Sequence, residues 1–253
     1  SKGFLWVGFP QGLVRYDGHA IRHYQYEPEN PNSLSGNYVC HIMEDRRGRI
    51  WVGTLSGGLN IYNREKDHFV RFKQIPSDSN SLVNNYVNYV FEDNSGTIWL
   101  GTNGGLDSVK QDGDGNILGF HHFTHNPQEP NSLGYHEVAS IAEYPEGVLW
   151  IMTQKNGMTR FDVNKHEFTV YRYERGNPHG LSGNLGKSNC IDIREDGAIL
   201  WVGTLGGISK AILNKKGEIM GEGFVNYRYN PSDSSSIPPS GITRVFLDKD
   251  HNL

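Results

Sequence analysis

Short apolar segments recur along the whole chain, and each is followed by glycines or by polar residues typical of turns. One of them, Ile50-Trp51-Val52-Gly53-Thr54, leads through Leu55-Ser56-Gly57-Gly58 into another apolar segment that begins at Leu59. Runs of about five β-branched and aromatic residues favour β-strands, and glycine pairs favour the tight turns of hairpins. The pattern therefore predicts many short strands joined by turns.

The tryptophans mark the same position in a repeat that runs through the chain. Each follows Leu or Ile, and each precedes a short strand, a turn and a glycine with an apolar neighbour, such as Gly58-Leu59. Their spacings are 45, 48, 51 and 51 residues. Five copies at one phase indicate packing between repeats, because the same aromatic fills the same place each time. These residues are Trp6, Trp51, Trp99, Trp150 and Trp201.

Two further strands complete each repeat. An aromatic strand such as 69–72 follows the turn, and a polar connection then closes with a pair such as Ser81-Leu82. The next strand, such as 87–92, runs into an acidic turn ahead of the following tryptophan. Four strands in a period of this length make one blade of a β-propeller. We therefore predict an all-β fold, a β-propeller of four-stranded antiparallel blades with five repeats present.

The two ends of the chain carry incomplete blades. The first strand of the Trp6 repeat is missing, and the turn at 248–252 follows a first strand that has no second strand. We expect residues 1–253 to form a single propeller domain or a fragment of one. Pairing of 242–246 with 5–8 would close five blades into a ring, because each end supplies the strand that the other lacks. Part of a larger propeller is the alternative.

Composition narrows the partners. The 253 residues include 24 basic and 28 acidic side chains, a formal charge of −4, so no broad basic surface is expected to attract nucleic acid. No segment approaches the roughly 20 apolar residues that cross a bilayer, which predicts a soluble fragment. The two cysteines, Cys40 and Cys190, occupy similar positions in strands of different repeats, where a disulfide is not expected.

The motif (Leu/Ile)-Trp-(Val/Leu)-Gly-Thr, followed by Gly-Gly-Leu and a connection closed by Ser-Leu, resembles the two-component regulator propeller repeat. The resemblance covers the whole chain. It implies the periplasmic, ligand-sensing part of a hybrid histidine kinase receptor, which recognises an oligosaccharide and signals through the membrane. It also implies a non-catalytic segment that packs with other blades or with a second propeller, in a receptor that forms a homodimer. The alternatives are the sensor of a membrane-bound diguanylate cyclase, a structural or dimerisation spacer, or a streptogramin-type lyase.

Candidate ligand contacts lie where the polar connections meet the turns that follow the tryptophan strands, since binding sites on such folds usually use that face. The Trp6 and Trp150 repeats depart from the motif in these turns, which favours them as contacts. No catalytic residue, metal ligand or cofactor is assigned. The candidate residues are Gln11, Tyr38, Ser56, Tyr86, Asn103, Tyr135, His136, Gln154, Lys155, Asn156 and Asn184.

Histidines offer two weaker hypotheses. His121, His122 and His125 form a cluster in which His121 and His125 would share one face of a strand, but a third metal ligand is missing. A lyase would need a His and Glu pair with a metal, and His136-Glu137 is the nearest pair. Adjacent strand residues point to opposite faces, so at most one of those two would serve.

Overall fold

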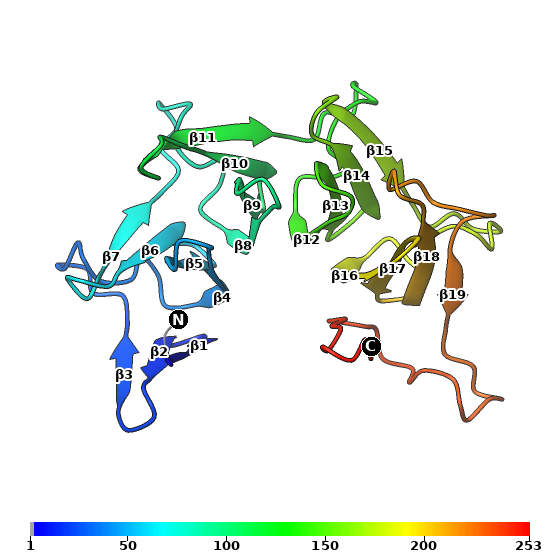
Figure 1. Ribbon diagram of the computed structural model, residues 1–253, viewed down its shortest axis with the longest axis horizontal. Helices are drawn as coiled ribbons and strands as arrows, with labels where there is room; N and C mark the ends of the chain where they lie inside the picture. Colours follow the sequence, from blue (N-terminus) through cyan, green and yellow to red (C-terminus); the bar gives the residue numbers. More distant parts are fainter. Residues whose placement is uncertain (1–2) are drawn as a thin grey trace. The chain divides into compact units, whose positions relative to one another are not determined.

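The computed structural model describes residues 3–253, whose strands form five antiparallel sheets (Figure 1). Four sheets have four strands and one has three, and neighbours in each sheet are consecutive in the chain. We number these sheets as blades 1 to 5. The predicted all-β class, with four-stranded antiparallel blades in propeller order, is confirmed. The described residues contain no helix of the length and apolarity needed to cross a membrane.

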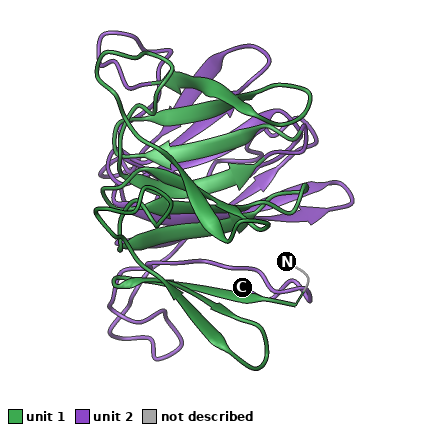
Figure 2. Cartoon of the chain, turned by 90° about the vertical axis from the view of Figure 1, so that its left-hand side faces the viewer, with its two compact units in different colours: residues 1–92, 96–123 green, residues 93–95, 124–253 purple. Residues whose placement is uncertain are grey.

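The chain divides into two compact units, which Figure 2 distinguishes by colour. Unit 1 comprises residues 1–92 and 96–123 and holds blades 1, 2 and 3. Blade 1 is β1 (Leu5–Phe9), β2 (Gly12–Tyr16) and β3 (Ile21–Tyr24); blade 2 is β4 (Val39–Glu44), β5 (Ile50–Thr54), β6 (Leu59–Asn63) and β7 (His68–Phe72); blade 3 is β8 (Val87–Glu92), β9 (Ile98–Thr102), β10 (Leu106–Gln111) and β11 (Ile117–Phe123).

Unit 2 comprises residues 93–95 and 124–253 and holds blades 4 and 5. The expectation of one domain over residues 1–253 concerns how the two units combine, and it stays a prediction. Blade 4 is β12 (Val138–Glu143), β13 (Val148–Thr153), β14 (Met158–Asp162) and β15 (Glu167–Tyr171); blade 5 is β16 (Gly186–Arg194), β17 (Gly197–Thr204), β18 (Gly207–Leu213) and β19 (Val225–Tyr227).

The tryptophans lie on the second strand of each four-stranded blade and on β1 of blade 1, and three of them, Trp51, Trp99 and Trp150, are at most 2% exposed. Trp51 joins a cluster with Leu82 and with residues of β8 and β9 in the next blade, which supports the predicted packing between repeats. Its indole Nε1 donates to the buried Asp45 carboxylate at 2.8 Å. The acidic turn therefore provides a hydrogen-bond acceptor as well as a hairpin.

The threonine of the motif closes the turn that follows the tryptophan strand. Thr54 Oγ1 donates to the carbonyl oxygen of Gly58 at 2.9 Å and accepts from the amide of Gly57 at 3.1 Å. Gly58 has φ +88°, and a Cβ there would overlap the Phe72 carbonyl oxygen. Glycine is therefore required at this position. In blades 3, 4 and 5 the threonine makes the same bond to the glycine at or just before the start of the third strand.

The residue pair that ends each polar connection anchors the connection to the core. Leu82 is 1% exposed, and the amide of Val83 after it donates to the buried Asp107 side chain at 3.0 Å. In every four-stranded blade, a buried side chain of the third strand accepts a hydrogen bond from such a backbone amide. The bond gives a partner to an amide that would otherwise be buried without one. The pairs are Ser35 with Asn60, Val83 with Asp107, Gly134 with Thr159 and Ser182 with Ser209.

Blade 4 departs from the motif for a packing reason. Elsewhere a glycine of the tryptophan strand makes room for an apolar residue further along the chain: a Cβ on Gly53 would lie 2.6 Å from Val87 O, and one on Gly203 would lie 2.7 Å from Ile242. Between blades 4 and 5 the large and small residues are exchanged: the tryptophan strand carries Met152, and the next blade carries Gly186, where a Cβ would overlap the Met152 side chain. Met152 thus fills the space that Val87 fills beside Gly53.

The expected pairing of 242–246 with 5–8 is not present, so ring closure by these strands is not observed. Within the described residues β1 pairs only with β2, and 242–246 is not a strand. The Ile242 amide instead donates to the Thr204 carbonyl at 2.9 Å, and the Val245 amide lies 3.3 Å from Ser188 Oγ. These contacts hold the segment against blade 5.

Candidate functional site

The connections between blades and the turns after the tryptophan strands lie together, as predicted. In unit 1 the Leu55 amide donates to the Tyr38 carbonyl at 3.0 Å, and the Gly58 amide donates to the Asn85 carbonyl at 2.8 Å. In unit 2 the Gln154 amide donates to the Glu137 carbonyl at 2.8 Å. Each of these turns is thus fixed to the start of its own blade, and the turn at Gly58 is also fixed to the next connection.

The candidate residues of unit 1 have two kinds of environment. Gln11, Tyr38 and Ser56 are exposed, and the Gln11 carbonyl accepts a bond from the Gln25 side chain at 3.0 Å. Tyr86 and Asn103 are half-buried, and the Asn103 amide donates to the Tyr86 carbonyl at 3.1 Å. These contacts do not assemble the five side chains into one cluster.

Unit 2 brings three candidate side chains together and holds the backbone of a fourth candidate, Gln154, beside them. The rings of Tyr135 and His136 stack with their centroids 4.1 Å apart, and Lys155 Nζ lies 5.7 Å from the centre of the Tyr135 ring. His136 Nε2 lies 3.7 Å from Glu137 Oε1. Gln154 is fixed through its backbone to Glu137. We call Tyr135, His136, Gln154 and Lys155 the Tyr135 cluster.

The side chains of the Tyr135 cluster are of the types that contact a ligand with a hydroxyl-bearing ring. Tyr135 is half-buried, with its ring in contact with His136 and Lys155, and the His136 side chain is 44% exposed. An aromatic face packs against the C–H face of a sugar, while Lys155, Gln154 and His136 offer hydrogen-bonding groups for hydroxyls. The cluster therefore has both kinds of group that a saccharide requires.

Asn156 and Asn184, in contrast, support the loops. Asn156 has φ +68°; its Nδ2 donates to the Gly134 carbonyl at 2.7 Å and its Oδ1 accepts from Arg172 Nε at 2.9 Å. Asn184 Oδ1 accepts a hydrogen bond from the Tyr173 backbone amide at 2.7 Å. Asn37 and Asn85, at equivalent positions in two other connections, accept similar bonds. The unusual turn of the Trp150 repeat thus has a structural explanation.

The histidine cluster separates into individual structural contacts. His122 Nδ1 lies 2.7 Å from Asp107 Oδ1, and this hydrogen bond raises the pKa of His122 above its usual value. His125 lies beyond the end of β11 and contacts the Leu133 carbonyl at 2.6 Å, so the expectation that it shares a strand face with His121 is wrong. Residues 3–253 contain no group of three or more His, Cys, Asp or Glu side chains arranged for a metal.

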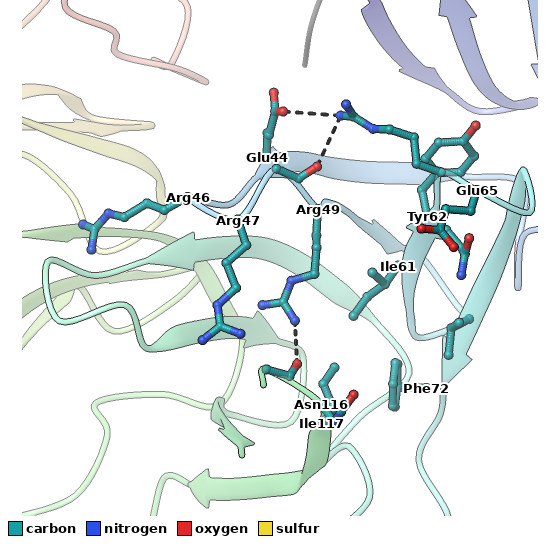
Figure 3. Close-up of a pocket in the computed structure, with 15 residues that line it drawn as sticks. Glu44, Arg46, Arg47, Arg49, Ile61, Tyr62, Glu65, Phe72, Asn116 and Ile117 are labelled. Atoms are coloured by element: carbon teal, nitrogen blue, oxygen red, sulfur yellow. Dashed lines mark hydrogen bonds and ion pairs between the residues drawn. The ribbon is translucent and has the colours of Figure 1, made fainter. Parts of the chain in front are cut away.

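A basic groove of about 840 Å³ lies in unit 1, at the ends of the strands opposite to the glycine turns (Figure 3). Its lining includes four arginines and two glutamates above an apolar floor. The arginines come from the turns 45–49 and 63–67, and neither turn is among the candidate ligand contacts predicted from the sequence. The excess of arginine between Arg46 and Arg49 was the available signal. The charged residues are Glu44, Arg46, Arg47, Arg49, Arg64 and Glu65, and the floor includes Ile61, Phe72 and Ile117.

Comparison with protein families identifies part of the repeat. Residues 33–56 and 81–104 match the family model described as the two-component regulator propeller. Each match starts at a buried serine that ends a connection and runs through the first two strands of a blade. These segments are therefore two-component regulator propeller repeats. No curated protein sequence matches the chain significantly.

Solved structures with the same fold include the extracellular domains of two hybrid two-component systems from B. thetaiotaomicron. The first is 20% identical, with a TM-score of 0.70 over 99% of this chain and 36% of that chain. The second is 19% identical, with a TM-score of 0.55 over 99% of this chain and 37% of that chain. This chain thus spans little more than a third of their length.

Virginiamycin B lyase from Staphylococcus aureus is also similar, at 15% identity and a TM-score of 0.56 over 87% of this chain and 66% of that chain. Similarity at these identities establishes a shared fold. Because one fold carries many activities, function has to be argued from the site.

Proposed function

We propose that this chain is part of the extracytoplasmic, ligand-sensing region of a hybrid two-component receptor, in which an oligosaccharide binds at the Tyr135 cluster. The observation that supports this most strongly is the combination of two matched regulator repeats with structural similarity, over 99% of the chain, to an extracellular domain of such a receptor. The segment acts by binding, and the catalytic output lies elsewhere in the receptor.

The Tyr135 cluster is the proposed contact because it joins an aromatic ring to polar groups on turns that the blade holds rigidly. The backbone bond between Gln154 and Glu137 fixes the turn to the connection, so little ordering is required on binding. A sensor must bind its ligand with different strength in two receptor states. In this proposal the blades keep their internal packing, and the signal passes through contacts with a second propeller or with the other protomer of a homodimer.

Ser56→Cys tests the extracytoplasmic location. Ser56 is exposed in a turn, so a membrane-impermeant maleimide is expected to label the variant in spheroplasts that express the whole receptor. The native thiols of this chain should react slowly, because they are half-buried and burial raises the pKa of both Cys40 and Cys190 to about 11, and labelling of the parent receptor gives the background. Labelling only after the cells are lysed would contradict the proposal.

The same cells distinguish the two signalling outputs. A hybrid histidine kinase should change its phosphorylation when a recognised oligosaccharide is added outside. A membrane-bound diguanylate cyclase would instead change the level of cyclic di-GMP.

A further inference from the structure

Two guanidinium groups converge in the basic groove. Figure 3 shows Arg47 and Arg49 side by side, both directed toward the segment that holds Asn116, while Arg46 points away from it. Gly115 forms the floor beneath them: a Cβ there would overlap Arg47 Nη1 and would lie 3.4 Å from Arg49 Nη1. Gly115 also has φ +85°, so a glycine both permits the turn and leaves room for the arginines.

Only one of these two charges is neutralised by a carboxylate within ion-pair distance. Arg49 Nε contacts Asp45 Oδ2 at 2.6 Å, Arg49 Nη1 donates to the Gly115 carbonyl at 2.7 Å, and the guanidinium lies 5.0 Å from the Trp51 ring. Among residues 3–253, the one hydrogen bond of the Arg47 side chain is a long contact, 3.4 Å, to the Gly113 carbonyl. Arg49 is therefore held rigidly, and the neighbouring Arg47 retains donors for another partner.

The groove lining carries four arginines and two glutamates, and the exposed Asp114 lies on the turn whose Gly113 carbonyl contacts Arg47. Arg64 lies 3.6 Å from Glu44, which accounts for one of the two lining glutamates. Glu65 is exposed on the turn at the far side, and Asp112 accepts hydrogen bonds from its own turn. A local excess of positive charge is notable in a chain whose formal charge is −4. An anion between Arg47 and Arg49 would relieve their mutual repulsion.

We propose that this groove binds a small anionic ligand, an oxyanion group carried on an apolar or ring-shaped body. Arginine forks match carboxylate, sulfate and phosphate oxygens in two-point contacts, and Arg47 presents such a fork over Gly115, beside the positive charge of Arg49. The body of the ligand would lie against Ile61, Phe72 and Ile117. This site is separate from the Tyr135 cluster and does not depend on the receptor function proposed above.

Titration calorimetry with inorganic sulfate and with benzenesulfonate tests the site on the 253-residue chain. Both anions should bind saturably, and benzenesulfonate should bind several-fold more tightly because its ring contacts the apolar floor. Arg47→Gln should weaken both by about 10-fold, since it removes a charge-assisted contact. Arg47→Lys should recover only part of the loss, because an ammonium lacks the planar fork.

Arg175→Gln is the matched control, since Arg175 is exposed in unit 2 and the substitution makes the same change in charge. It should leave binding unchanged. The site would be overturned if neither anion bound. It would also be overturned if Arg47→Gln and Arg175→Gln lost the same amount of affinity. Because Arg47 is exposed, its variants should keep the melting temperature of the parent chain, so lost binding cannot be ascribed to unfolding.

Discussion

Replacing Trp51 with alanine is expected to lower the free energy of unfolding by about 3–5 kcal/mol, the usual cost of truncating a large buried aromatic. Trp51 is completely buried and belongs to the cluster that joins blade 2 to blade 3. The indole bond to Asp45 adds to this loss. Equilibrium urea unfolding followed by far-UV circular dichroism measures the effect without relying on tryptophan fluorescence.

Trp6→Ala is the matched control for this prediction. Trp6 occupies the same position in its repeat, but it is only half-buried and its Nε1 has no hydrogen-bond partner among the described residues. Its truncation should therefore cost clearly less than that of Trp51. Equal costs, or a Trp51→Ala variant that unfolds normally but has lost oligosaccharide binding, would show that the tryptophans are not primarily packing residues.

Gly186→Val is expected to destabilise unit 2 by about 3 kcal/mol, because the added side chain would occupy the space of Met152. Met152→Gly alone should cost a similar amount, since it leaves a cavity in a fully buried position. The double variant restores the glycine and valine arrangement of other blades. It should therefore lose much less stability than the sum of the two single changes.

The double-variant cycle is measured by urea unfolding of all four proteins. Strictly additive losses would mean that Met152 and Gly186 do not compensate each other. The unusual sequence of the Trp150 repeat would then again require a functional explanation.

The repeat predicted the strands well because each blade repeats one set of local rules. The tryptophan strand, the threonine turn and the pair that closes the connection are all contiguous motifs, so periodicity was enough to place them. The partner of Met152 was not predictable in the same way. Gly186 lies on the next blade, and its missing side chain acquires meaning only when the two strands are packed together.

The candidate site was predictable in position and less so in detail. The connections and glycine turns do lie together, and Tyr135, His136, Gln154 and Lys155 do form a cluster. Asn184 has the same polar character, yet its hydrogen bonds are used within its own loop. The basic groove was not predicted, because its residues come from turns of two different blades and the sequence does not show that these turns lie side by side. The expected pairing of 242–246 with 5–8 is not detected, because the hydrogen bonds that hold the segment 242–246 to blade 5 come from residues far apart in the sequence.

Titration calorimetry of the 253-residue chain with a panel of oligosaccharides tests the proposed sensing function most directly. The account predicts saturable heat with at least one oligosaccharide and a loss of about 10-fold or more in affinity for Tyr135→Ala, since stacking on the ring would be removed. Tyr229→Ala, which removes a tyrosine that is 49% exposed in another connection, should bind like the parent chain. No heat with any oligosaccharide, from this chain or from the intact receptor, would identify a structural spacer, and undiminished binding by Tyr135→Ala would contradict the proposed site.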